Sequence, residues 1–185
     1  MAAAKRSTVH VALLRGINVS GKNKLPMAEL AQMFESAGCR DVETYIQSGN
    51  VVFAANARLA PRLPAIIEQA ILSSFDYQVP VVMRSASELA AVIRNNPFVA
   101  KPTDTKALHV AFLADRPTST QLASLDPHRS PPDRFVVRGS EIYLCCPNGI
   151  GRSKLTNAYF DTRLETTSTF RNWKTVTRLF EIVGR

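Results

Sequence analysis

The sequence predicts an α+β protein made of two ferredoxin-like lobes of the βαββαβ type, with antiparallel sheets and helices on one face. Three observations predict this fold. Strand and helix patterns follow this order in the first half, a tight turn at Gly49 joins two neighbouring strands, and the second half repeats the pattern of the first. With 185 residues and 45% hydrophobic composition, the chain is long enough for two small packed lobes.

Hydrophobic periodicity and chain breakers predict six elements in the first half. They are strand 9–15, helix 27–37, strand 42–47, strand 50–55, helix 59–75 and strand 79–84. Pro26 favours a helix start and Gly38 a helix end. The turn Ser48-Gly49-Asn50 leaves no room for a crossover helix, so its two strands must be antiparallel.

The second half repeats this arrangement. Residues 108–113 have the pattern of residues 9–14, and residues 135–144 repeat the hairpin around Gly49, which indicates an internal duplication. We expect helices at 118–125, 155–164 and about 170–183. In the last helix, Ser168 or Thr169 is the expected cap, and the expected apolar stripe consists of Trp173, Val176, Phe180 and Val183.

These patterns predict a first lobe at residues 1–95, which includes a linking helix, and a second lobe at 96–185 with a C-terminal helix, both within one family domain. The residues Ser85-Ala86-Ser87-Glu88 form a capping box that opens the linking helix. Residues 95–104, with two prolines, are the expected joint between the lobes.

The composition favours partners that carry phosphate. The formal net charge is +8, and residues 147–185 contain seven Lys or Arg against three Asp or Glu. No signal peptide and no apolar run of transmembrane length is found, so no membrane association is expected. Three cysteines without metal-ligand spacing favour a cytoplasmic location and no metal.

The loop from Arg15 to Lys24 matches the phosphate-binding pattern G-x-x-x-x-G-K but has Asn23 where a hydroxyl residue binds magnesium. We therefore expect the loop to bind an anion without magnesium-dependent ATP hydrolysis, and we expect no cofactor. The alternative is a solvated loop with a basic tip.

A second basic loop, residues 147–154, follows a predicted strand in the same way and offers its cations near a helix start. A third basic segment surrounds Trp173, where the alternative is an amphipathic helix with Trp173 in the core. Phe53 and Tyr143 are the only aromatic candidates for an RRM-type base-stacking sheet, so that pattern is not met. His10 and His109 occupy equivalent strand positions, which favours structural roles.

The expected ligand-binding residues are polar or basic side chains of these segments and of the Gly49 turn. They are Arg15, Asn18, Lys22, Lys24, Ser48, Asn50, Arg152, Ser153, Lys154, Arg171 and Asn172. If loops at equivalent strand ends face one another across the lobe boundary, Arg15, Arg152 and Arg171 converge on one anion. No nucleophile or acid–base constellation is recognised, so the catalytic residues are unknown and the enzyme class stays open.

Three functions are compatible with these features. The favoured one is binding of a phosphate-bearing ligand, more specifically nucleic acid, in a basic cleft. The alternatives are an enzyme that acts on a small phosphorylated or carboxylated metabolite, and an interaction module without ligand chemistry. The sequence leaves the oligomeric state open.

Four separated motifs carry a resemblance to a known family. They are residues 15–19, residues 27–30, residues 44–53, and the pair 148–155 and 171–176 at the C-terminal end. Together they resemble the bacterial family catalogued as domain of unknown function 1697. The resemblance implies a cytoplasmic bacterial α+β protein of ferredoxin-like build, and it implies no activity or catalytic residue. Phe170 stands where many relatives have a hydroxyl residue.

Overall fold

The computed structural model describes residues 7–99 and 104–185. Two four-stranded antiparallel sheets form, and helices pack on one face of each, which confirms the predicted fold class. The first sheet has the order β2-β3-β1-β4 and the second β6-β7-β5-β8, so both have the ferredoxin-like strand order. The same order in both halves of the chain is consistent with the predicted duplication.

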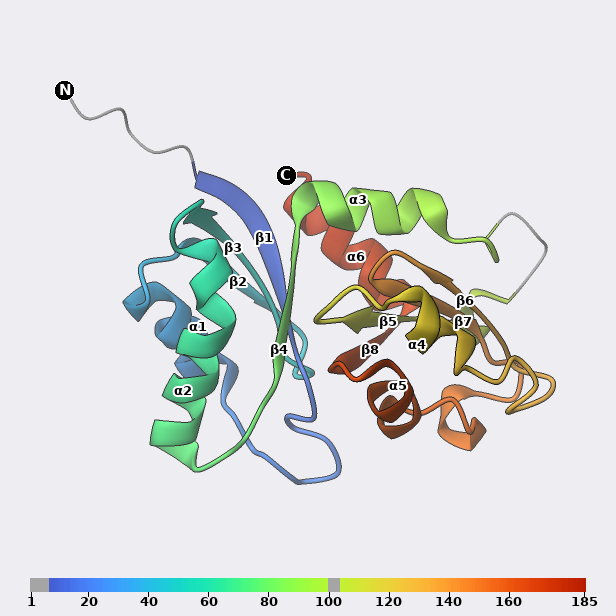
Figure 1. Ribbon diagram of the computed structural model, residues 1–185. Helices are drawn as coiled ribbons and strands as arrows, with labels where there is room; N and C mark the ends of the chain where they lie inside the picture. The colour runs from blue at the N-terminus through green and yellow to red at the C-terminus, as the bar shows by residue number, and fades with distance from the viewer. Residues whose placement is uncertain (1–6, 100–103) are drawn as a thin grey trace. The chain divides into compact units, whose positions relative to one another are not determined.

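The first sheet contains β1 (Ser7–Leu14), β2 (Arg40–Tyr45), β3 (Asn50–Asn56) and β4 (Val81–Ser85). Helices α1 (Met27–Ser36) and α2 (Leu63–Phe75) lie along this sheet, as Figure 1 shows at the left. Residues of β1 and β3 alternate, so that Ala12, Leu14 and Phe53 point to the helices and join Phe34 in the core. A 3-10 turn, η1 (Ala60–Arg62), precedes α2.

The second sheet contains β5 (Leu108–Leu113), β6 (Arg134–Arg138), β7 (Glu141–Cys145) and β8 (Ser168–Asn172). Helices α4 (Ser119–Ala123) and α5 (Asn157–Leu164) belong to this repeat, and 3-10 turns η2 (Thr105–Ala107) and η3 (Ile150–Arg152) flank its strands. Its core contains Ala111 and Leu113 of β5, which occupy the positions of Ala12 and Leu14. The equivalence of 9–14 and 108–113 therefore extends to the direction of the side chains.

A helix follows the fourth strand of each repeat. These helices are α3 (Ala86–Asn95) and α6 (Trp173–Val183). The predicted capping box at the start of α3 is present, because Glu88 Oε2 accepts from the Ser85 amide at 2.7 Å and Ser85 Oγ accepts from the Glu88 amide at 3.3 Å.

The predicted start of the last helix was wrong. Residues 168–172 form β8, which pairs antiparallel with β5, and α6 begins only at Trp173. Ser168 and Thr169 therefore lie in a strand, and the residue that caps α6 is Asn172, whose Oδ1 accepts from the Thr175 amide at 2.8 Å. The apolar pattern typical of a buried strand is missing from β8, because it contains polar residues that are buried. Ser168 is fully buried, and its hydroxyl donates to Asp161 Oδ1.

The predicted apolar stripe of α6 was wrong in its last two positions, Phe180 and Val183. Trp173 and Val176 are buried as expected, but the stripe continues through Leu179 and Ile182, and Phe180 is 38% exposed. The buried apolar residues of α6 follow one another at intervals of three from Trp173, whereas the prediction placed Phe180 four residues after Val176.

Contacts divide the described chain into two compact units. One consists of residues 7–89 with 179–185, and the other of residues 90–99 with 104–178. The predicted lobe boundary between residues 95 and 96 remains a proposal. Part of the predicted joint, residues 100–103, lies outside the described residues. Within the described ranges, no helix has both the length and the apolar character needed to span a membrane.

Candidate anion-binding loops

The loop between β1 and α1 is an ordered structure that its own backbone and side chains hold together. The Lys22 amide donates to Val19 O at 2.9 Å, which closes a tight turn, and the Asn18 amide donates to Asn23 O at 3.1 Å. Asn23 Nδ2 donates to Gly16 O at 3.0 Å. Asn23, which breaks the magnesium-binding pattern, therefore stabilises the base of the loop.

Asn18 connects this loop to the β2–β3 turn. Its Nδ2 donates to Leu25 O and to Gln47 O, both at 2.9 Å, and its Oδ1 accepts from the Leu25 amide at 2.8 Å. Both amide hydrogens are thus used inside the protein. This geometry favours a structural role for Asn18, and a ligand contact by its side chain stays a prediction.

The cations of the first loop differ in exposure. Lys22 and Lys24 are exposed, and the described residues offer no partner to either ammonium group. Arg15 is half-buried at the end of β1, and its amide donates to Pro80 O at 3.0 Å. The two lysines are therefore the side chains of this loop that an anion can reach most freely.

The predicted hairpin turn at Gly49 is present between β2 and β3. Asn50 is fully buried, and its Nδ2 donates to Tyr45 O and Ser48 Oγ, both at 3.0 Å. Gly49 has φ +79°, and a Cβ there would lie 2.7 Å from Leu14 Cβ. Asn50 and Ser48, both predicted ligand residues, thus contribute to the turn itself.

The second basic loop lies between β7 and α5 and includes η3. Ser153 Oγ accepts from the Leu155 amide at 3.0 Å, and the Lys154 amide donates to Ser130 Oγ at 3.0 Å. Helix α5 begins two residues later than expected, with Thr156 Oγ1 accepting from the Tyr159 amide. The Arg152 and Lys154 side chains are exposed, and among the described residues neither has a partner.

Arg152 lines a cavity of about 250 Å³ that the Pro-rich loop closes on the other side. Asn148 and Gly149 of the second loop contribute to the wall, and so does Asp133. Asp133 Oδ2 accepts from Ser130 Oγ at 2.7 Å. A carboxylate in the wall weakens the attraction of this cavity for an anion.

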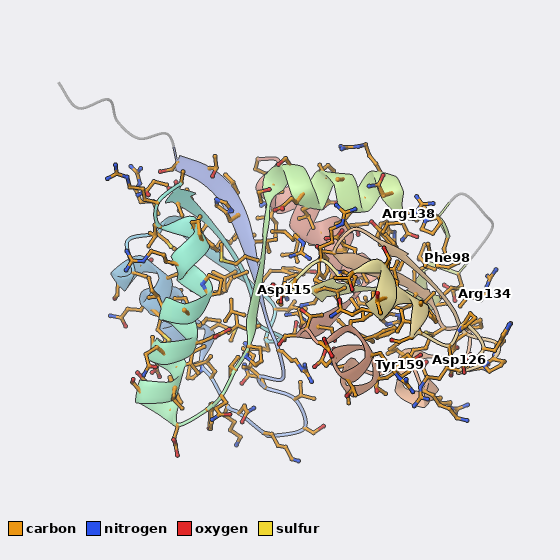
Figure 2. All side chains as sticks on the ribbon, viewed as in Figure 1. Phe98, Asp115, Asp126, Arg134, Arg138 and Tyr159 are labelled. Carbon is orange, nitrogen blue, oxygen red and sulfur yellow. The ribbon has the colours of Figure 1, made fainter. Side chains whose placement is uncertain are left out.

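Arg129 is a cation of the same region that the sequence analysis missed. Its guanidinium lies 4.2 Å from the centroid of the Tyr159 ring, and its Nε donates to Lys154 O at 3.1 Å. Tyr159 is itself held, because its Oη accepts from the Asp126 amide at 2.8 Å; Figure 2 shows both residues at the lower right. No local sequence motif marks Arg129 as part of this surface. Its contact with Lys154, which lies 25 residues later in the chain, is what places it there.

Arg171 and Asn172, the remaining predicted residues, occupy the end of β8. Arg171 is 7% exposed, and its Nη1 donates to Thr169 Oγ1 at 3.0 Å and to Phe170 O at 2.8 Å. Burial lowers the pKa of Arg171 to about 10. The premise that the two basic loops leave equivalent strand ends was wrong, because the first follows β1 and the second follows β7, which is equivalent to β3. The convergence of Arg15, Arg152 and Arg171 on one anion stays a prediction.

The sheets do not offer an aromatic platform for bases. Phe53 and Tyr143 are each 1% exposed, and the strand face opposite α1 and α2 carries aliphatic residues such as Val11 and Val52. Binding of single strands by base stacking needs exposed aromatic rings.

The three cysteine thiols and the imidazole of His109 are also buried. Cys39, Cys145 and Cys146 are all buried, and burial raises the pKa of Cys39 and of Cys146 to about 11. These two thiols are protonated near neutral pH and are poor nucleophiles. In residues 7–99 and 104–185, no group of three or more His, Cys, Asp or Glu side chains could hold a metal ion.

The fold and the loops together define a class: α+β proteins of two ferredoxin-like repeats with basic loops after a central strand and a hairpin. The family described as "Protein of unknown function (DUF1697)" matches residues 7–143, and the chain belongs to that family.

One solved structure shows the same fold over nearly the whole length. It is that of the conserved bacterial protein SP0830 from Streptococcus pneumoniae, with a TM-score of 0.72 and 23% sequence identity. The similarity covers 96% of this chain and 99% of that chain. No match was found among curated proteins.

Proposed function

We propose that the protein binds a phosphate-bearing ligand through its basic loops and that nucleic acid is the favoured class of ligand. The observation that carries the proposal is the set of exposed cations on ordered loops. Lys22, Lys24, Arg152 and Lys154 are exposed, and their charged groups have no partner among the described residues. Unpaired cations release counterions when they contact phosphates, which favours binding.

The second loop is the stronger of the two candidates. Arg152 and Lys154 lie two residues apart, and the hydrogen bond from Arg129 Nε to Lys154 O adds a third cation to this surface. Because the backbone of the loop is fixed by Ser130 and Ser153, little order has to be imposed when a ligand binds.

The burial of Phe53 and Tyr143 supports a particular mode of binding. Without a stacking platform, the protein would contact the phosphate backbone rather than base edges. Such binding depends steeply on salt and weakly on sequence.

A small phosphorylated or carboxylated metabolite is the second candidate. The cavity of about 250 Å³ beside Arg152 favours it, since Asn148 and Ser130 add hydrogen-bonding groups to one cation. Its acidic residue, Asp133, is the reason why this candidate ranks second. An interaction module without ligand chemistry is what remains if neither ligand binds.

A cytoplasmic location belongs to the same proposal. Cys39, Cys145 and Cys146 are free thiols, which suits a reducing compartment.

The test is binding of a fluorescent single-stranded RNA and a DNA of equal length, measured by anisotropy at low salt. The variant Arg152→Gln/Lys154→Gln should bind at least about tenfold more weakly, because two charge-assisted contacts are lost. The matched control is Arg58→Gln/Arg62→Gln, which removes two exposed arginines from the turn before α2.

The control variant has the same net charge as the loop variant. If both variants lose the same affinity, binding follows overall charge and the loop is not the site. If the unmodified protein binds neither RNA nor DNA at low salt, nucleic acid is excluded as the ligand class.

A further inference from the structure

A cavity of about 340 Å³ lies along α5 in the second unit, and none of its lining residues is among the ligand-binding residues expected from the sequence. Its lining consists of two arginines, two threonines, a tyrosine and an alanine: Arg129, Arg163, Thr156, Thr162, Tyr159 and Ala158. Its size is at the lower end of the range for small-ligand pockets.

Arg129 is held in place on one side of this cavity. The Tyr159 ring supports the guanidinium at 4.2 Å, and Lys154 O accepts from Nε at 3.1 Å. Tyr159 is buried, so the support is itself rigid. The terminal Nη1 and Nη2 groups of Arg129 have no partner among the described residues, so they can donate two parallel hydrogen bonds to an oxyanion.

Arg163 supplies the second cation from the last turn of α5. Its carbonyl accepts from Ser124 Oγ at 3.1 Å, which ties its backbone to the end of α4, whereas its guanidinium has no partner within residues 7–99 and 104–185. The hydroxyl groups of Thr156 and Thr162 can each donate a further hydrogen bond.

The charge of the lining separates this cavity from two others. The cavity beside Arg152 includes Asp133, and a groove of about 390 Å³ between α1 and α2 includes Glu29 but no cation. The lining of the α5 cavity has two cations and no acidic side chain. Of these three cavities, it is the one whose electrostatics favour an anion.

We propose that the α5 cavity binds a phosphate monoester through Arg129 and Arg163. A monoester has three terminal oxygens and nearly two negative charges near neutral pH, which match two guanidinium groups and two hydroxyl groups. The monoester is either the terminal phosphate of a nucleic acid strand or a small phosphorylated molecule. The first source rests on the proposed function, whereas the second does not.

The experiment compares three ligands: a single-stranded oligonucleotide with a 5′-phosphate, the same oligonucleotide with a 5′-hydroxyl, and ribose 5-phosphate. We expect the 5′-phosphate to increase affinity at least fivefold. Arg163→Gln should remove this preference and leave the affinity for the 5′-hydroxyl strand within about twofold, since the expected strand contacts are Arg129, Arg152 and Lys154 and not Arg163. Arg62→Gln, a change of equal charge in the first unit, should preserve the preference.

The outcomes separate the two proposals. Equal affinity for both oligonucleotides, or a preference that survives both Arg163→Gln and Arg129→Gln, overturns the monoester site and leaves the proposed function intact. If neither oligonucleotide binds, nucleic acid is excluded as the ligand class, and calorimetry with ribose 5-phosphate decides the site. If ribose 5-phosphate binds and Arg163→Gln abolishes this binding, the result supports the site. If ribose 5-phosphate does not bind, the result overturns the site. Circular dichroism of each variant confirms that it is folded.

Discussion

Arg84 and Arg171 occupy equivalent positions in the two repeats. Arg84 pairs with Val11 of β1, and Arg171 pairs with Val110 of β5. Each donates from Nη1 to the carbonyl of the preceding residue, at 2.7 and 2.8 Å, and each is less than 10% exposed. A buried arginine at the same register in both sheets indicates a structural requirement of the repeat, because arginines are rarely buried without partners.

This equivalence predicts that Arg171 stabilises the fold. Its side chain donates to Thr169 Oγ1 and Phe170 O, so Arg171→Met should lower the free energy of unfolding by about 2 to 3 kcal/mol. Arg152→Met, at an exposed position, should change it by less than about 0.5 kcal/mol. Urea unfolding of both variants measures the difference, and equal stabilities would show that the buried guanidinium is dispensable.

Gly49 should be required for close packing as well as for the backbone of its turn. A Cβ at Gly49 would lie 2.7 Å from Leu14 Cβ and 2.9 Å from Ile17 Cδ1, whereas Gly21, with the similar φ of +77°, has no atom within 4 Å. Both alanine variants incur the left-handed backbone penalty of about 1 kcal/mol, and only Gly49→Ala adds overpacking of about 1 to 3 kcal/mol.

Thermal or urea unfolding of the two glycine variants separates these contributions. The difference between them isolates the packing term, because their φ angles are alike. Equal losses of stability at Gly49 and Gly21 would contradict the close approach of Leu14.

His109 should make stability depend on pH. Burial lowers the pKa of His109, opposed by a hydrogen bond to Ala107 O. As the pH falls through 6.5, the unfolded chain takes up the proton before the folded protein does, so the contribution of His109 to stability is present above this pH and is lost below it.

His109→Gln should therefore weaken the loss of stability between pH 7 and pH 5. Urea unfolding at several pH values measures this, and His10→Gln is a second test because burial also lowers the pKa of His10. Parallel pH profiles for the variant and the unmodified protein would contradict the assignment.

The fold could be predicted because its strongest signals are local. Pro26, Gly38 and the Gly49 turn mark element ends, and the alternating apolar residues of β1 and β5 fix which side of each strand is buried. The start of α6 could not be predicted in this way. In β8, Ser168 and Arg171 are polar residues that only the pairing with β5 and the contact with Asp161 bury.

The candidate site was predicted less completely than the fold. The exposure of Lys22, Lys24, Arg152 and Lys154 agrees with side chains available to a ligand. Asn18 shows the limit of a motif, because a polar residue in a glycine-rich loop can equally use its amide to hold the loop. Arg129 and Arg163 lie outside any recognisable pattern, and only the folded chain brings them to one cavity.

The most direct measurement is the affinity for a single-stranded oligonucleotide as a function of salt concentration. If Arg129, Arg152 and Lys154 contact three phosphates, the logarithm of the association constant should fall against the logarithm of salt with a slope of about −2. Arg152→Gln/Lys154→Gln should reduce that slope to about −0.7, and Arg58→Gln/Arg62→Gln should leave it unchanged. A slope near zero for the unmodified protein, or the same slope in the loop variant, would contradict phosphate binding by the second basic loop.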